Sequence, residues 1–255
     1  MSELTVKVEN GICHIAISRP EKRNTIDSAT CLTWVKILAQ AQKDEEIRCV
    51  VLSGEEGIFC AGADLGETLH PTAQSEEAYQ ALIESMIAFD KPILAAVQGP
   101  AVGLGVAILG FSDLVYCGEK TLFSLPFTAL GLSPAYGLSF SLGEKAGYRK
   151  ALEKLLLSEP ISAIEALHMG IVTDIVKDED VLKETLARAA RLSLLPPESV
   201  RATKALMRRE HAGAIREAIR AEQQTLQQRL QSKEAAEAYR AFKEGRKPDF
   251  RTKAQ

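Results

Sequence analysis

The sequence predicts an α/β fold that continues into a helical region at the C-terminal end. Two short aliphatic runs, "CVVLSG" at 49–54 and "PILAAVQG" at 92–99, lack polar alternation, which is typical of strands buried on both faces of a sheet. Helix-like segments lie between such runs, so that strands and helices alternate as they do in crossover units. From about residue 137 the apolar spacing is helical almost to the end of the chain.

The N-terminal part predicts a hairpin followed by a helix. "LTVKVENGICHIAIS" alternates around Asn10 and Gly11, a pair that strongly indicates a hairpin turn. "SATCLTWVKILAQAQ" then has apolar residues at helical spacing, with Ser28 as the expected N-cap. We interpret Trp34 as a core or interface residue.

The middle of the chain is expected to hold further strands and helices around the two aliphatic runs. A polar loop is expected over 67–76 and a helix over about 77–90. "GLGVAILGFS" predicts a short apolar helix, and "DLVYC" and "LFSLP" predict strands.

The segment "LLPPESV" at 194–200 marks the expected domain boundary, and a helix should begin after its two prolines. We therefore divide the chain into an α/β core at 1–195 and a helical region at 196–255. The second part is rich in Ala, Glu, Gln, Arg and Lys, which cannot form a sizeable core alone. It is expected to pack on another surface, either in the same chain or on a second subunit.

The composition excludes several classes of protein. In 255 residues, 31 Lys and Arg stand against 34 Asp and Glu, and no basic block lies outside the C-terminal end. A nucleic-acid partner is therefore not expected, because phosphate binding needs a concentrated basic face. No apolar run reaches the roughly 18 residues of a membrane span, and the N-terminus lacks a signal-peptide pattern. We expect a cytoplasmic location and no membrane contact.

The cysteines and histidines do not have the spacing of a metal site. Several cysteines lie in apolar, strand-like runs, which predicts buried thiols in a reducing compartment. The five cysteines are Cys13, Cys31, Cys49, Cys60 and Cys117. No metal is expected.

Two turns rich in Gly and Ala follow buried strands: "CAGAD" at 60–64 and "GPAVGLG" at 99–105. The second turn opens a helix, where main-chain N–H groups lack partners and carry partial positive charge. Two such N–H groups could converge on one carbonyl oxygen and stabilise an oxyanion, each by about 3–4 kcal/mol. The alternative is that glycine is needed for turn geometry alone. A dinucleotide fingerprint is excluded because Ile108 occupies the position of its third glycine.

Several segments together carry a resemblance to a known family. They are "RPEKRN" at 19–24, "VVLSG…IFCAGADL" at 50–65, "KPILAAVQGPAVGLGVAILGFSDLVYCGEKTLFSLPFTALGLSP" at 91–134 and "AFKEGRKPDF" at 241–250. In this order they resemble the enoyl-CoA hydratase/isomerase family of the crotonase superfamily, and locally the Δ3,Δ2-enoyl-CoA isomerases of peroxisomal type. The resemblance implies a spiral of ββα units with C-terminal helices that assemble trimers or hexamers.

The resemblance also implies the ligand and its contacts. An acyl-CoA thioester would be the substrate, with coenzyme A as part of it and no separate cofactor. The oxyanion donors would be the backbone N–H groups of Ala63 and Leu104. Further contacts would lie along CoA: Ala61, Asp64 and Leu65 beside its adenine end, Lys22 and Arg23 near its phosphates, and Phe242 lining the ligand. A lysine that hydratases carry three places after this aromatic is Gly245 here. Asp64 is also interpreted as a residue that holds the turn.

The departures from the family pattern concern proton transfer. Hydratases activate water with two glutamates, and the matching positions here are Ala107 and Phe127. The single carboxylate of the isomerases matches Ala135. Hydration by the two-glutamate mechanism is therefore not expected. Glu67 could reach the pocket, or could serve only the start of a helix.

Tyr136, next to the missing acid, gives a further possibility. Methylmalonyl-CoA decarboxylases of this superfamily carry a Pro-Tyr pair close to this point, and a tyrosine hydroxyl can steer a departing carboxylate. Otherwise Tyr136 lines the acyl pocket.

Three functions remain open from the sequence. The preferred one is an enzyme of fatty acyl-CoA metabolism that stabilises a thioester enolate, isomerase- or hydratase-like, with an atypical acid or base. The second is an acyl-CoA-binding protein without catalysis. The third is a lyase that decarboxylates a malonyl-type CoA with the help of Tyr136.

Overall fold

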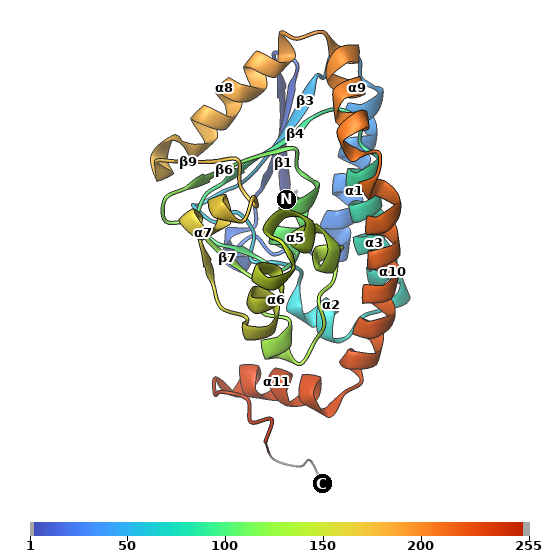
Figure 1. Cartoon of the computed structure of the whole chain (residues 1–255), viewed down its shortest axis with the longest axis vertical. Helices are drawn as coiled ribbons and strands as arrows, with labels where there is room; N and C mark the ends of the chain where they lie inside the picture. The colour runs from blue at the N-terminus through green and yellow to red at the C-terminus, as the bar shows by residue number, and fades with distance from the viewer. Residues whose placement is uncertain (1–2, 252–255) are drawn as a thin grey trace.

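The computed structural model describes residues 3–251, and within this range the strands form two sheets (Figure 1). The larger has six strands in the order β1-β2-β3-β4-β6-β9, parallel except for the antiparallel pair β1 and β2. The smaller has three strands in the order β5-β7-β8. The strands are β1 (Leu4–Glu9), β2 (Ile12–Ile17), β3 (Cys49–Gly54), β4 (Ile93–Val97), β5 (Ala101–Val102), β6 (Leu114–Gly118), β7 (Leu122–Ser124), β8 (Ile161–Ser162) and β9 (Asp174–Val176).

Helices pack on both faces of the larger sheet (Figure 1). The α-helices are α1 (Ser28–Lys43), α2 (Leu65–Leu69), α3 (Ala73–Ala88), α4 (Leu104–Phe111), α5 (Leu138–Ala146), α6 (Tyr148–Leu157), α7 (Ala163–His168), α8 (Val181–Ser193), α9 (Pro197–Arg208), α10 (His211–Leu230) and α11 (Lys233–Glu244). Three short 3-10 helices complete the described chain: η1 (Pro20–Lys22), η2 (Thr128–Leu130) and η3 (Asp178–Asp180).

Strand β3 shows why its sequence has no polar alternation. Val50 and Leu52 lie in the main core with Trp34 of α1, whereas Val51 faces the other way and packs near Ala189 of α8. Each of these side chains is at most 1% exposed. The expected doubly buried strand is confirmed, and so are the N-terminal hairpin and the burial of Trp34. All five cysteines are buried and free, as expected.

The start of α1 differs from the expectation by one residue. Asp27, not Ser28, is the N-cap: its Oδ1 accepts hydrogen bonds from the Thr30 N–H (2.9 Å) and hydroxyl (2.8 Å). The other carboxylate oxygen of Asp27 pairs with the Arg19 guanidinium at 2.8 Å. The carboxylate therefore caps the helix with one oxygen and holds the preceding turn with the other. A serine has a single side-chain oxygen without charge and could not do both.

The prediction of a polar loop over 67–76 is wrong in its extent, because helices occupy both ends of this range. Helix α2 occupies its first part because the Asp64 carboxylate caps it, and α3 begins already at Ala73. That early start is fixed by a capping box in which Thr72 and Ser75 bond each other's backbone N–H. The expected continuous helical pattern after 137 also misses β8 and β9, which are too short to show a period and are defined by pairing with β7 and β6.

The helical region beyond residue 195 packs against the core of its own chain. In Figure 1, α9 and α10 lie on the same side of the molecule as α1 and α3. Helix α9 has no residue that is buried as a whole, although the Lys204 side chain is only 7% exposed: its Nζ contacts the Lys91 carbonyl (2.6 Å) and Asp113 (2.8 Å). Helix α10 pairs Arg216 with Glu84 of α3. No helix within residues 3–251 combines the length and apolarity needed to cross a membrane.

Candidate active site

The two turns rich in Gly and Ala lie against each other. The N–H of Cys60 donates to the Pro100 carbonyl (3.1 Å), and the N–H of Val102 donates to the Cys60 carbonyl (2.9 Å). A Cβ at Gly105 would lie 2.8 Å from the Cys60 carbonyl oxygen, and a Cβ at Gly62 would lie 3.0 Å from the Val102 carbonyl oxygen. The close approach of the two turns therefore requires glycine at 105, and at 62 it adds to a backbone φ of +104° that favours glycine.

Ala63 follows Gly62 in a short parallel bridge with Ile26. The N–H of Ile26 donates to the Gly62 carbonyl, and the N–H of Asp64 donates to the Ile26 carbonyl, both at 2.8 Å. In a parallel bridge the residue between these two contacts directs its own N–H away from the partner strand. The Ala63 N–H accordingly has no acceptor among residues 3–251.

Leu104 begins α4 directly after Gly103, whose φ of +49° is a left-handed value. The first N–H groups of a helix have no partner within the helix. Within the described part of the chain, the Leu104 N–H donates to no protein group. The two turns thus provide two main-chain donors, at Ala63 and Leu104, for which residues 3–251 offer no acceptor.

The basic turn expected near the CoA phosphates adjoins the first of these turns. The N–H of Ala61 donates to the Arg23 carbonyl at 3.1 Å, and the side chains of Lys22 and Arg23 are exposed. Asn24 anchors this turn: it is fully buried and donates to the carbonyls of Glu55 (2.9 Å) and Ile58 (2.6 Å). Sequence reasoning did not single out Asn24, because an asparagine that follows a run of charged residues is typical of a surface turn.

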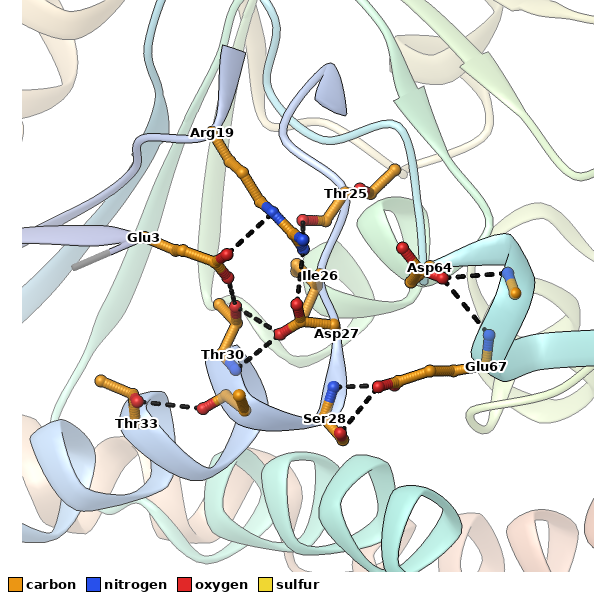
Figure 2. Close-up of polar contacts among 12 residues, drawn as sticks. Glu3, Arg19, Thr25, Ile26, Asp27, Ser28, Thr30, Thr33, Asp64 and Glu67 are labelled. Atoms are coloured by element: carbon orange, nitrogen blue, oxygen red, sulfur yellow. Dashed lines mark hydrogen bonds and ion pairs between the residues drawn. The ribbon is translucent and has the colours of Figure 1, made fainter. Parts of the chain in front are cut away.

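Asp64 and Glu67 both organise the backbone around α2 (Figure 2). Asp64 Oδ1 accepts the N–H groups of Gly66 (2.9 Å) and Glu67 (3.3 Å), which confirms its expected role in the turn. The Glu67 carboxylate accepts the N–H and the hydroxyl of Ser28, both at 2.8 Å, and the Tyr79 hydroxyl at 3.0 Å. Glu67 therefore joins the start of α1 to α2 and α3. Leu65, the first residue of α2, is half-buried.

A cavity of about 80 Å³ lies between α2, α3, α10 and the turn at Ala135 and Tyr136. Its wall is mainly apolar, and Glu67 and Glu222 are two of the carboxylates that reach it. The apolar lining includes Ile83, Ile219, Leu226 and Leu230, together with the rings of Tyr79 and Tyr136. Glu67 lies on α2, the helix that begins directly after the turn at 60–64. The cavity therefore lies next to the helix that follows Ala63.

Tyr136 is half-buried in this wall. Its ring lies against that of Tyr79, with 6.1 Å between centroids and a 51° tilt. Burial raises the pKa of the Tyr136 hydroxyl above its ordinary value, so the group is protonated at neutral pH. Among residues 3–251 this hydroxyl has no hydrogen-bond partner, unlike that of Tyr79, which donates to Glu67 and to the Ile26 carbonyl.

The three positions that the resemblance matches to catalytic carboxylates hold apolar side chains. Ala107, Phe127 and Ala135 are 1%, 8% and 5% exposed. Ala135 lines the cavity beside Tyr136. Proton transfer by these three side chains is chemically excluded.

Phe242, the C-terminal residue that the resemblance places at the ligand, does not lie at the cavity. It is 63% exposed on α11. Gly245 ends α11 in a left-handed conformation, and Arg246 next to it pairs with Glu237. Glu222 of α10, by contrast, lies in the cavity wall and was missed from the sequence. A signal was present: Glu222 falls on the apolar stripe formed by Ile215, Ile219 and Leu226.

Comparison with solved structures defines the class of protein. An enoyl-CoA hydratase/isomerase from Pseudoalteromonas atlantica T6c superposes with a TM-score of 0.92 at 29% identity, covering 97% of this chain and 99% of that one. The fold is thus the crotonase-like α/β spiral with C-terminal helices that the resemblance implied.

The chain belongs to the enoyl-CoA hydratase/isomerase family, whose model matches residues 7–253. It is 30% identical to 2,3-dehydroadipyl-CoA hydratase of Escherichia coli over 98% of this chain and 99% of that protein. It is 31% identical to enoyl-CoA delta isomerase 2 of Rattus norvegicus over 94% of this chain, and spans 63% of that relative's length. The family acts on acyl-CoA thioesters.

Proposed function

We propose that this protein converts an acyl-CoA thioester through an enolate whose oxyanion accepts hydrogen bonds from the N–H groups of Ala63 and Leu104. The observation that carries the proposal is the pair of amides that find no acceptor within the described part of the chain, on two turns that are bonded to each other through Cys60. Each such donor is worth about 3–4 kcal/mol of transition-state stabilisation. The reaction is isomerase- or hydratase-like, with an acid or base that differs from the family's glutamates.

The two ends of the substrate have different surroundings in this proposal. The exposed Lys22 and Arg23 meet the phosphates of CoA, since their turn is bonded to Ala61 beside the first oxyanion donor. The acyl group enters the apolar cavity between α3 and α10. Coenzyme A arrives as part of the substrate, and the protein's own groups supply binding, orientation and polarisation of the thioester carbonyl.

Decarboxylation of a malonyl-type CoA is a second candidate, favoured by one observation. The Tyr136 hydroxyl is protonated and has no partner among the described residues, so it can donate to a carboxylate that leaves C2. Loss of CO₂ breaks the bond between C2 and the carboxylate carbon and leaves its electrons in the thioester enolate, so the first step needs stabilisation of the enolate and no carboxylate base. Ala107, Phe127 and Ala135 are compatible with this requirement.

A single panel of substrates separates the candidates. The protein is incubated with crotonyl-CoA, a 3-enoyl-CoA and methylmalonyl-CoA, while absorbance of the conjugated thioester and release of CO₂ are followed. Conversion of the 3-enoyl-CoA is the expected result. CO₂ release from methylmalonyl-CoA alone would instead favour the decarboxylase. Tight binding of acyl-CoA without turnover of any of the three would make this an acyl-CoA-binding protein and overturn the enzyme proposal.

We also propose that the protein assembles as a homotrimer or hexamer. Helix α9 supports this, because it buries no residue while Leu206 and Met207 are 71% and 75% exposed. Sedimentation equilibrium tests the proposal, and a monomer at micromolar concentration would contradict it. The cytoplasmic location stays a prediction.

A further inference from the structure

The turn that carries Tyr136 has an unusual backbone. Tyr136 has φ of +63° and Gly137 has φ of +80°, so two successive residues are left-handed. Glycine adopts this conformation freely, but a residue with a Cβ is strained in it. The conformation at Tyr136 therefore persists only where surrounding contacts impose it.

Glu222 of α10 supplies such contacts. One carboxylate oxygen accepts the Gly137 N–H at 2.6 Å, and the other accepts the Ser139 N–H at 2.7 Å. The Glu222 side chain is buried, with the residue 6% exposed. Both amides lie at the N-terminal end of α5. The N-cap residue of this helix is Gly137, which has no side chain that could accept them. A carboxylate from a distant helix thus does the work of a helix cap.

The fit between α10 and the turn is close. A Cβ at Gly137 would lie 3.2 Å from Ile215 and 3.4 Å from Ile219, both on α10. Ile219 and Glu222 also line the cavity that Tyr136 faces. The same face of α10 therefore packs on the turn, bonds its backbone and closes the cavity.

We propose that Glu222 is a positioning residue of the acyl site: through the Gly137 and Ser139 amides it holds the Tyr136 ring in the cavity wall. This inference rests on the proposed function, in which that cavity takes the acyl group. It gives the C-terminal helical region a part in substrate binding within its own chain, in addition to any part in assembly.

The chemistry of the contact explains why a carboxylate is used. A carboxylate is an acceptor at both oxygens and can satisfy two converging N–H groups at once. In Glu222→Gln one of the two acceptors becomes an amide donor that opposes an N–H. The turn then loses at least one bond, and Tyr136 is free to relax to negative φ and to withdraw its ring from the position beside Tyr79.

The test is a double-mutant cycle on Glu222→Gln and Tyr136→Gly, with Glu217→Gln on the exposed face of α10 as the control. Tyr136→Gly removes both the ring and the strain. For the acyl-CoA that the wild type converts, we expect each single variant to raise KM about five- to tenfold. The double variant should be no worse than Tyr136→Gly alone, and the control should match the wild type. Multiplied losses in the double variant would show independent action and overturn the proposal.

A measurement without turnover separates this inference from the proposed function. In the full-length Glu222→Gln protein, the Gly137 and Ser139 amides should exchange with solvent at least tenfold faster than in the wild type, and unchanged exchange would overturn the inference. If Glu222→Gln does not fold, exchange of these amides in the wild type decides: protection supports the inference and solvent-like exchange refutes it. Faster exchange together with no acyl-CoA binding would remove only the proposed function.

Discussion

Gly105 lies so close to Cys60 that a Cβ at position 105 would come within 2.8 Å of the Cys60 carbonyl oxygen. That oxygen also accepts the Val102 N–H, so the backbone there has little freedom to move away. Gly105→Ala should therefore push the two small-residue turns apart. We expect a loss of about 1–3 kcal/mol in the free energy of unfolding, as for other overpacked sites, and a lower kcat for the converted acyl-CoA.

Urea unfolding and steady-state kinetics measure both effects. The matched control is Gly143→Ala in α5, because a Cβ there would meet nothing within 4 Å. Alanine in an open helical position should leave activity unchanged and stabilise by about 0.5–1 kcal/mol. Equal behaviour of the two variants would show that the contact between the turns has no consequence.

Asp64 should act through the α2 N-cap, and its charge should matter little. Asp64→Ala removes the acceptor for Gly66 and Glu67 and should cost about 1 kcal/mol, whereas Asp64→Asn retains a good N-cap and should cost a few tenths. Chemical denaturation gives the free energies, and calorimetric titration gives the affinity for an acyl-CoA. A large loss of affinity in a stable Asp64→Asn protein would instead assign Asp64 a direct contact with CoA.

The buried side chain of Lys204 should make the stability of the folded protein depend on pH. Burial lowers its pKa to about 8, despite the nearby Asp113. Below pH 8 the lysine is protonated in both the folded and the unfolded state, so its desolvation cost is present in full. Between pH 8 and the ordinary lysine value near 10.4, the unfolded state binds more protons, so stability rises with pH. The cost of burying the charge is thus relieved as the pH rises.

The Lys204→Met variant tests this directly. Relative to the variant, the wild type should gain roughly 1–3 kcal/mol in free energy of unfolding between pH 7 and pH 10. Asp113 keeps Arg208 as a partner in the variant, at 2.9 Å, so it is not left unpaired. Lys36→Met, at an exposed position of α1, controls for removal of a surface charge. A pH-independent difference at position 204 would contradict the prediction.

Tyr136→Phe distinguishes a chemical role of the hydroxyl from a role of the ring. If the protein releases CO₂ from methylmalonyl-CoA with the help of this hydroxyl, the variant should lose about 10- to 100-fold in kcat, since one positioned donor is absent. Tyr79→Phe is the control, because its hydroxyl is committed to Glu67 and Ile26. That change should cost about 1 kcal/mol of stability. If Tyr136→Phe still releases CO₂ at the wild-type rate, the hydroxyl has no chemical role, and Tyr136 contributes only its ring to the wall of the acyl cavity.

The local sequence predicted those elements whose own composition carries a period or a turn signal. The hairpin at Asn10 and Gly11 and the doubly buried β3 are of this kind, and both are confirmed. The errors fall where a partner decides the conformation. Strands β9 and β8 are strands because β6 and β7 pair with them. The start of α3 at Ala73 is a different error, because the capping box of Thr72 and Ser75 is a local signal that the expected loop overlooked.

The candidate site was accessible from the sequence only in part. The two small-residue turns were found, and the structure adds that Gly62 and Gly105 face backbone of the opposite turn. The roles of Ala63, Leu104 and Tyr136 stay predictions. Glu222 was missed because it lies far along the chain from Tyr136, although a glutamate on an apolar helical stripe indicates a buried acceptor.

The sequence alone determined the N-terminal hairpin, the burial of β3 and the presence of two turns rich in Gly and Ala, because hydrophobic period and glycine placement act over a few residues. Only the tertiary structure decided that α10 brings Glu222 to the backbone behind Tyr136 and that Glu67 joins three helices. Such contacts join residues far apart in the chain, and their geometry exists only once the core has packed.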